Sequence, residues 1–251
     1  LVVLGLLLLT GVGGLTSFGQ AAFVGIGAYT TAWLTTAMAV SPWLALLVGL
    51  ILTFMVAYVL GAITLRLSGH YLPLGTIAWC LSLYYLFGNL EFLGQYDGIA
   101  GIAPIKFFGI SLGSGRYIYY LIWVIVLLSM WATRNLLDSR PGRAIRALRS
   151  GGGMAESFGI NMASYKVIIF VYAALLACLS GWLYAHMQRA VSPSPFGLNY
   201  GIEYLFMAVV GGAGSVWGAV LGSGLILTLK DQIQNVLPHI LNTSANFELI
   251  V

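Results

Sequence analysis

The chain has 251 residues, of which 60% are apolar and only 7% are charged. Soluble domains carry charge on roughly a quarter of their residues, so this composition excludes a water-soluble enzyme and indicates a membrane protein. We expect an all-α, polytopic transmembrane helical bundle of about eight spans or part-spans, some broken at glycines, in one domain over residues 1–251. Because the chain begins and ends in apolar stretches, we also expect that a span is missing at one or both ends.

Uncharged intervals locate the spans, because an ionised side chain at the bilayer centre costs roughly 3 kcal/mol or more. The first interval, residues 1–65, has room for two full spans and part of a third, with a turn at Ser41 and Pro42. Further intervals of helical length cover residues 67–90, 117–133, 167–188 and 204–229. The last is expected to hold two pieces, because two glycines interrupt it.

Basic residues concentrate in one segment, which holds six of the eleven lysines and arginines between Arg134 and Lys166. Positively charged loops are retained in the cytoplasm, so we expect a cytoplasmic loop at about 134–166. Its arginines recur every third residue and trace one broad helical face, suited to an acidic partner or to lipid headgroups: Arg140, Arg143, Arg146 and Arg149. Segments of balanced charge are expected on the outer side: residues 91–116, Arg189 with Glu203, and Lys230 with Asp231.

Stripes of small residues at four-residue spacing are typical of close helix packing in lipid. Three such stripes occur: Ser17, Ala21 and Gly25; Ala173, Ala177, Gly181 and Ala185; and Gly214, Gly218 and Gly222. Plain helix packing explains them, and contact with a transported solute is the alternative.

Two double-glycine breaks follow apolar runs, and a serine comes three residues after each of them. A helix broken at membrane depth needs protein or a water-filled cavity to satisfy its backbone, and such breaks often face a solute. A tight turn near the cytoplasmic surface is the alternative, and a weak internal repeat is a further interpretation. Polar and glycine positions at the breaks are candidate pathway residues: Gly13, Gly14, Ser17, Gln20, Gly211, Gly212 and Ser215.

The chemistry of an enzyme is not visible in the sequence. None of the lysines follows the glycines of a phosphate-binding loop, so any ATP chemistry belongs to a partner. Cys80 and Cys178 lie in apolar runs without metal-like spacing and are expected to be free, buried thiols. The histidines are scattered, so we expect no metal site and no cofactor in this chain, and the net charge of +4 reports orientation rather than nucleic acid binding.

Four stretches carry a resemblance to a known family, in order along the chain. They are GLTSFGQAAFVGIGAY at 14–29, RLSGHYLPLGT at 66–76, the basic SRPGRAIRALR at 139–149 followed by AESFGIN at 155–161, and GGAGSVWG at 211–218. In these stretches the chain resembles the LivM-type permease subunits of bacterial branched-chain amino-acid ABC importers. The resemblance covers nearly the whole chain.

This resemblance implies a multi-pass subunit of the bacterial cytoplasmic (inner) membrane that uses ATP, with Mg, hydrolysed by other chains. It implies a heterodimer with a LivH-like permease subunit, two cytoplasmic ATP-binding subunits and a periplasmic or extracellular solute-binding protein. The family's coupling helix corresponds to Met154, Ala155, Glu156, Ser157, Phe158, Gly159, Ile160 and Asn161. The family's coupling glutamate is replaced by Gly153, so we expect the helix to begin near Met154, with Glu156 in its first turn.

Other functions stay open on sequence grounds alone. An ATP-independent carrier or channel for a small solute is the main alternative, and a structural membrane scaffold is the other. A glycine-rich outer segment, residues 95–104, is either a surface for a binding protein or a folded external loop. The permease patterns are shared by importers of branched-chain amino acids, urea, amides and aromatic acids, so the sequence does not identify the solute.

Overall fold

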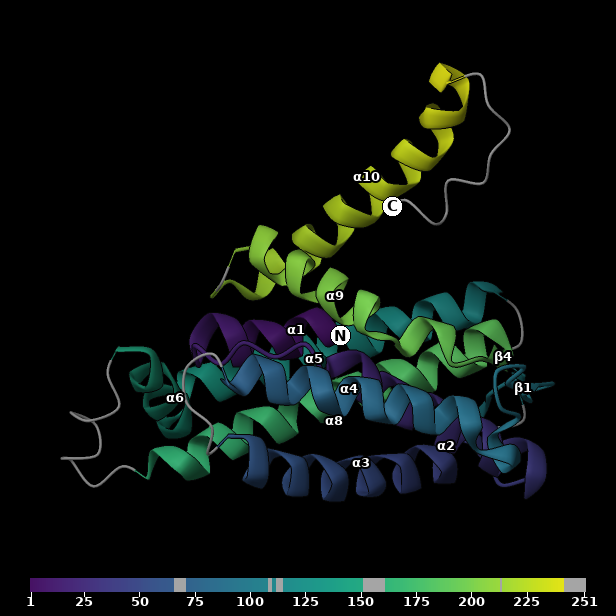
Figure 1. Cartoon of the computed structure of the whole chain (residues 1–251), viewed down its shortest axis with the longest axis horizontal. Helices are drawn as coiled ribbons and strands as arrows, with labels where there is room; N and C mark the ends of the chain where they lie inside the picture. The colour runs from purple at the N-terminus through teal and green to yellow at the C-terminus, as the bar shows by residue number, and fades with distance from the viewer. Residues whose placement is uncertain (66–70, 108–109, 112–114, 151–160, 213, 242–251) are drawn as a thin grey trace.

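A computed structural model describes residues 1–65, 71–107, 110–111, 115–150, 161–212 and 214–241 (Figure 1). The described helices are α1 (Val2–Leu6), the π-helix η1 (Leu7–Val12), α2 (Gln20–Ala37), α3 (Pro42–Thr64), α4 (Tyr71–Asn89), α5 (Gly115–Asp138), α6 (Arg140–Ser150), α8 (Met162–Gln188), α9 (Leu198–Val210) and α10 (Val216–Leu241). Two short 3-10 helices, η2 (Glu91–Leu93) and η3 (Ser194–Phe196), lie in connections. The predicted all-α bundle is confirmed.

The uncharged intervals correspond closely to the helices. Within the described residues, α3, α4, α5 and α8 are long and apolar enough to cross a bilayer, and α1 with η1 and α9 form shorter apolar pieces. Ser41 caps α3 by accepting a hydrogen bond from the amide of Leu44, and Pro42 occupies the first helical position, as a helix start requires. Residues 204–229 hold parts of α9 and α10, as predicted.

The segment at 134–166, predicted to be a cytoplasmic loop, contains helices in its described part. Helix α5 continues through Arg134 to Asp138, α6 covers Arg140–Ser150, and α8 begins at Met162, so Lys166 is helical. Charged side chains reach beyond the apolar core of a span, so a helix need not end where its charges begin. The basic segment is therefore largely helical in its described part.

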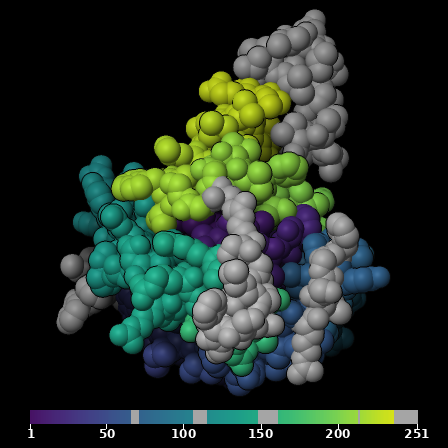
Figure 2. All heavy atoms as spheres, turned by 90° about the vertical axis from the view of Figure 1, so that its left-hand side faces the viewer, coloured from purple at the N-terminus to yellow at the C-terminus, as the bar shows by residue number. Residues whose placement is uncertain are grey.

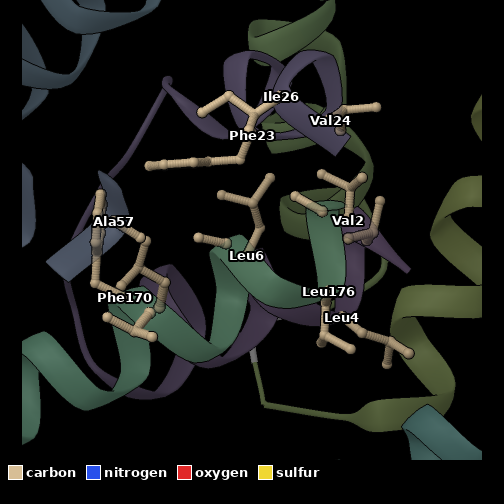
Figure 3. Close-up of a cluster of buried hydrophobic side chains, with 14 of the residues drawn as sticks. Val2, Leu4, Leu6, Phe23, Val24, Ile26, Ala57, Phe170 and Leu176 are labelled. Atoms are coloured by element: carbon tan, nitrogen blue, oxygen red, sulfur yellow. The ribbon is translucent and has the colours of Figure 1, made fainter. Parts of the chain in front are cut away.

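Helix α8 occupies the centre of the bundle, where it packs against α1, α2, α3, α5 and α6. Side chains of α8 and of three neighbouring helices meet in one apolar cluster, among them Leu6, Phe23, Ala57 and Phe170 (Figure 3). The rings of Phe23 and Phe170 contact edge to face, with centroids 5.6 Å apart. Helix α1 is buried on all sides, because α2, α8, α9 and α10 all contact it.

Helices α2 and α8 touch through their backbones. A Cβ atom on Gly181 would lie 2.0 Å from the carbonyl oxygen of Val24, and one on Gly27 would lie 2.3 Å from that of Cys178. Only glycine permits so close an approach, which maximises dispersion contacts between helices that gain little from hydrophobic burial in lipid. The Ala173 to Ala185 stripe is therefore a packing face, and all four of its members are buried.

Helices α9 and α10 form a second close pair, joined by the predicted glycine break. A Cβ atom on Gly218 would lie 1.9 Å from the carbonyl oxygen of Gly211, and one on Gly222 would lie 2.4 Å from that of Met207. Gly214, expected on the same face, lies before α10 in a turn with φ +124°. Beyond these first turns, α10 leaves the body of the bundle at an angle (Figure 1).

An ion pair joins α9 and α10 farther along. Lys230 Nζ lies 3.3 Å from Glu203 Oε2 and 5.9 Å from the centre of the Tyr200 ring. Lys230 and Asp231, expected on the outer side of the membrane, both lie within α10, where Glu203 on the neighbouring helix compensates the lysine charge. Both partners of the pair are mostly buried.

Lys230→Met is expected to lower the free energy of unfolding by about 1–3 kcal/mol, because it leaves the mostly buried Glu203 carboxylate unpaired. The double variant with Glu203→Gln should recover most of this loss. Unfolding in detergent, followed by circular dichroism, measures both, and Asp231→Asn is the matched control on an exposed charge. If Lys230→Met unfolds like the unaltered chain, the ion pair contributes no net stability.

The two ends of the bundle differ in character. At one end lies α6 with its arginines, and at the opposite end lie the strands β1 (Ile99–Ala100) and β4 (Ala190–Val191) (Figure 1). These strands pair antiparallel, with Ile99 opposite Val191. A second pair, β2 (Lys106–Phe107) with β3 (Ile110–Ser111), is a short hairpin.

Candidate functional site

The first glycine break interrupts the bundle between η1 and α2. Gly14 adopts φ +68°, a left-handed conformation that favours glycine, and residues 15–19 run without regular structure to the start of α2. Six consecutive π-helical residues precede the break, a rare geometry that is frequent at functional sites. The sequence indicated the break itself, but not the π-helix.

Neighbouring groups satisfy much of the freed backbone. The amide of Leu15 donates to the carbonyl of Leu9 at 2.9 Å, and Thr10 Oγ1 donates to the carbonyl of Leu15 at 3.2 Å. The amide of Phe18 donates to Thr76 Oγ1 of α4 at 3.2 Å. Irregular backbone inside a membrane needs such hydrogen-bond partners, so the bundle stabilises this break.

The irregular segment is held between α4 and α9. A Cβ atom on Gly201 of α9 would lie 2.2 Å from the carbonyl oxygen of Phe18, and one on Gly19 would lie 3.1 Å from the carbonyl oxygen of Thr76. Thr76 falls in a stretch that carries the family resemblance, but sequence reasoning did not identify it as a partner of the break. The contact joins residues 58 apart in sequence, so no local pattern could reveal it.

Two polar side chains are buried at this break. Ser17 is 2% exposed and Gln20 is 1% exposed, and neither the Ser17 hydroxyl nor either end of the Gln20 amide makes a hydrogen bond to a described residue. Each such group costs about 1–3 kcal/mol when left unsatisfied. The described contacts therefore leave hydrogen-bonding capacity unused at this break, and both residues were candidate pathway residues.

The second break has a different environment. Gly212 adopts φ +91°, and Ser215 caps α10 by accepting a hydrogen bond from the amide of Gly218 at 3.2 Å. Gly212 and Ser215 are exposed, and Gly211 is half-buried. This geometry matches the alternative of a tight turn between two helices. The structure therefore places Gly211, Gly212 and Ser215 in a surface turn, in contrast to the buried Ser17 and Gln20.

Helix α6 presents the predicted basic face. Ser139 caps it by accepting a hydrogen bond from the amide of Gly142 at 3.3 Å. Arg140, Arg143 and Arg146 are exposed, and Arg146 lies 3.8 Å from the exposed Asp138. Arg149 lies in the same helix.

The opposite face of α6 is buried against the bundle. Ile145 is fully buried and belongs to the apolar cluster that includes Val12 of η1 and Ile169 of α8. Helix α6 packs against both η1 and α8. Sequence reasoning missed this contact, although the apolar Ala144 and Ile145 among the arginines are the pattern of an amphipathic helix.

Figure 2 looks onto the α6 end of the molecule. The purple N-terminal segment reaches this end between the lime-green residues of α9 and α10 and the teal residues of α5 and α6. Of the predicted coupling residues, Met154 to Ile160 lie outside the described residues. Asn161 is exposed and caps α8, where its Oδ1 accepts a hydrogen bond from the amide of Ser164 at 3.2 Å.

The opposite end is closed by a packed cap. His186 Nδ1 lies 3.0 Å from the carbonyl oxygen of Ala103, and the Trp182 indole donates to the carbonyl of Pro42 at 3.0 Å. The amide of Ile102 donates to the carbonyl of Arg189. The segment at 95–104 is thus folded against α8, as the interpretation of a folded external loop requires. The other interpretation, a surface for a binding protein, stays a prediction.

The described side chains offer no grouping of three His, Cys, Asp or Glu residues that could hold a metal ion. Cys80 and Cys178 are buried free thiols, as predicted. The candidate site therefore has three parts: the buried polar break, the π-helix η1 that precedes it, and the basic amphipathic helix α6, which contacts η1.

Comparisons with known proteins identify relatives of this chain. A family model described as branched-chain amino acid transport system / permease component matches residues 1–251. The permease protein LivM of Escherichia coli (strain K12), from a high-affinity branched-chain amino acid transport system, is 28% identical over 92% of this chain and 60% of its own length. The corresponding LivH of Salmonella typhimurium is 28% identical over 94% of this chain and 81% of its own length. BraD of Pseudomonas aeruginosa is 36% identical over 49% of this chain and 41% of its own length.

No solved structure matches the chain. The chain spans about 60% of the length of the LivM relatives. The family model nevertheless covers every residue of the chain, and the membrane-length helices and the broken helix fit a multi-pass membrane protein. The chain therefore belongs to the family of branched-chain amino acid transport system permease components.

Proposed function

We propose that this chain is a transmembrane permease subunit of an ABC importer that moves a small polar solute, a branched-chain amino acid, into the cytoplasm. In this function it performs no bond chemistry. It converts the motion of docked ATPases into opening and closing of a pathway through the bundle. Its relatives LivM, LivH and BraD are named as permease proteins of branched-chain amino acid transport systems, which supports this choice of solute.

One observation carries the proposal: a continuous set of contacts leads from the basic surface to the buried break. Helix α6 exposes three arginines on one face, and its other face packs on η1. The π-helix leads into the irregular segment that holds Ser17, and Gln20 follows it as the first residue of α2. A movement imposed on α6 is thereby passed to the one break where described polar side chains are buried without partners.

The proposed assembly contains three further kinds of subunit. A second, LivH-like permease subunit pairs with it, and two cytoplasmic ATP-binding subunits bind ATP and Mg. A periplasmic or extracellular solute-binding protein delivers the solute at the β1–β4 end. The coupling helix at 154–161 and the α6 arginines dock on the ATPases, whose acidic surface would complement them.

The proposed location is the bacterial cytoplasmic (inner) membrane. The α6 end faces the cytoplasm, since arginine-rich segments are retained there during insertion. The β1–β4 end then faces outward.

Uptake by membrane vesicles that contain the complete transporter tests the proposed function. Accumulation of labelled leucine should require ATP on the face of the membrane that carries the ATPases, which is the inside of right-side-out vesicles. Accumulation should stop when the ATPase subunits are left out. Uptake that persists without them would identify an ATP-independent carrier or channel. No flux under any condition would instead identify a structural scaffold.

Gln20→Leu is expected to reduce uptake at least tenfold while raising the free energy of unfolding by about 1–3 kcal/mol. The substitution removes a buried amide that makes no hydrogen bond to a described residue, so the fold gains stability as the polar contact with the solute is lost. Uptake and detergent unfolding of the same preparation measure both effects.

Thr35→Val is the matched control for Gln20→Leu on the same helix. Thr35 is 8% exposed, but its hydroxyl already donates to the carbonyl of Thr31 at 2.7 Å. We expect uptake by this variant to be unchanged. A loss of stability in Gln20→Leu together with normal uptake would show that the amide has a structural partner and no role in the pathway.

A further inference from the structure

A lateral groove opens between α3 and α8, in the half of the bundle that carries α6. It has a volume of about 630 Å³. Its walls are mainly apolar and aromatic and include Phe54, Tyr58, Ala62, Val171 and Leu175. This volume is within the range of small-molecule sites, roughly 300–1,000 Å³.

The groove faces sideways rather than into the bundle. Phe54 and Tyr58 on one wall are about half exposed, and so is Ile168 beside them on α8. Helix α3 is exposed along its whole outer face, as a lipid-facing helix is. Molecules of the bilayer therefore have direct access to this groove.

A positive charge lies at the groove. Lys166 lines it together with Ser164, both in the first turns of α8, where the helix dipole adds positive potential. No ion pair between Lys166 and a described carboxylate is present. Helix α6, which exposes Arg140, Arg143 and Arg146, also packs on α8.

We propose that this groove binds an anionic phospholipid of the membrane, with an acyl chain along the apolar walls and the phosphate on Lys166. Apolar walls and a cation at one end complement the two parts of such a lipid. Placing the lipid in the cytoplasmic leaflet rests on the orientation given under the proposed function. The groove and its charge do not depend on transport.

Native mass spectrometry of the purified full chain tests the site, with phosphatidylglycerol and phosphatidylcholine as probes. The unaltered chain should retain one phosphatidylglycerol in preference to phosphatidylcholine. Lys166→Gln should lower phosphatidylglycerol occupancy at least fivefold, and Ala62→Phe, which fills the groove, should lower it similarly. Arg134→Gln, which also removes a positive charge, and Ala132→Phe, which adds the same ring, are at exposed positions of α5 and should not lower it.

Three results would overturn the site. Equal binding of the two lipids would remove the role of the charge, and equal losses in Lys166→Gln and Arg134→Gln would indicate unspecific surface attraction. Efficient cross-linking of Ile168→Cys to a second permease subunit in the assembled complex would make the groove a subunit interface. These measurements need neither ATP nor solute, so they stay interpretable if the proposed transport function fails.

Discussion

Replacing Gly181 by leucine is expected to prevent the bundle from assembling. Gly181 stands where α8 crosses α2, and even a Cβ atom there would lie 2.0 Å from the carbonyl oxygen of Val24 and 2.8 Å from the amide nitrogen of Ala28. These are backbone atoms of a helix, so no change of side-chain rotamer can relieve the clash. The two helices would have to separate by more than an ångström, which opens the core around the most buried span.

The expected size of this effect is large for a single substitution. Overpacking a core costs about 1–3 kcal/mol when side chains can adjust, and more when the obstacle is backbone. We expect Gly181→Ala to lose about 2–3 kcal/mol and Gly181→Leu to yield no monodisperse protein in detergent. Size-exclusion chromatography and thermal unfolding measure both.

Gly224 offers a matched control for Gly181. It also lies inside a helix, but a Cβ atom there would meet nothing within 4 Å. Gly224→Leu should keep the elution profile, and Gly224→Ala should gain up to about 1 kcal/mol from helix propensity. If Gly181→Leu elutes and unfolds like Gly224→Leu, the close crossing of α2 and α8 is not required for the fold.

The helices themselves could largely be predicted from the sequence, because their signals are local. Charge-free intervals locate spans through the cost of burying an ion in lipid, and the Ser41-Pro42 turn begins α3 where predicted. The boundaries near charges were less accurate. Lys166 lies inside α8 because a lysine can extend from a helix to the membrane surface, so its position does not mark a helix end.

The candidate site was predictable only in part, for a physical reason. Gln20 and Ser17 could be selected because polar residues beside a helix break are unusual in lipid. Their burial, and the support of the break by Thr76, depend on helices far away in sequence. The same glycine pattern at Gly211 and Gly212 forms a surface turn, so the pattern alone does not distinguish a buried break from an exposed one.

Ile145→Asp is expected to abolish uptake while leaving the bundle folded. Ile145 is fully buried where α6 packs on η1 and α8, and an aspartate there would lie among the apolar described side chains of this cluster. An unpaired buried charge costs several kcal/mol, more than a peripheral helix gains by docking through one face. Helix α6 should therefore detach, and ATP hydrolysis by the partner subunits should no longer drive solute movement.

Three measurements separate this uncoupling from simple unfolding. Uptake by Ile145→Asp should fall at least tenfold, while its unfolding midpoint stays within a few degrees of the unaltered chain, since the core helices keep their contacts. Ile145→Leu, which keeps the apolar contact, should restore uptake, and Asn135→Asp, a charge added at an exposed position of α5, should have no effect. Normal uptake by Ile145→Asp would show that motion reaches the pathway without α6. If Ile145→Asp instead unfolds the whole bundle, Ile145 is required for the fold of the core. The proposed separate role of α6 in coupling would then be contradicted.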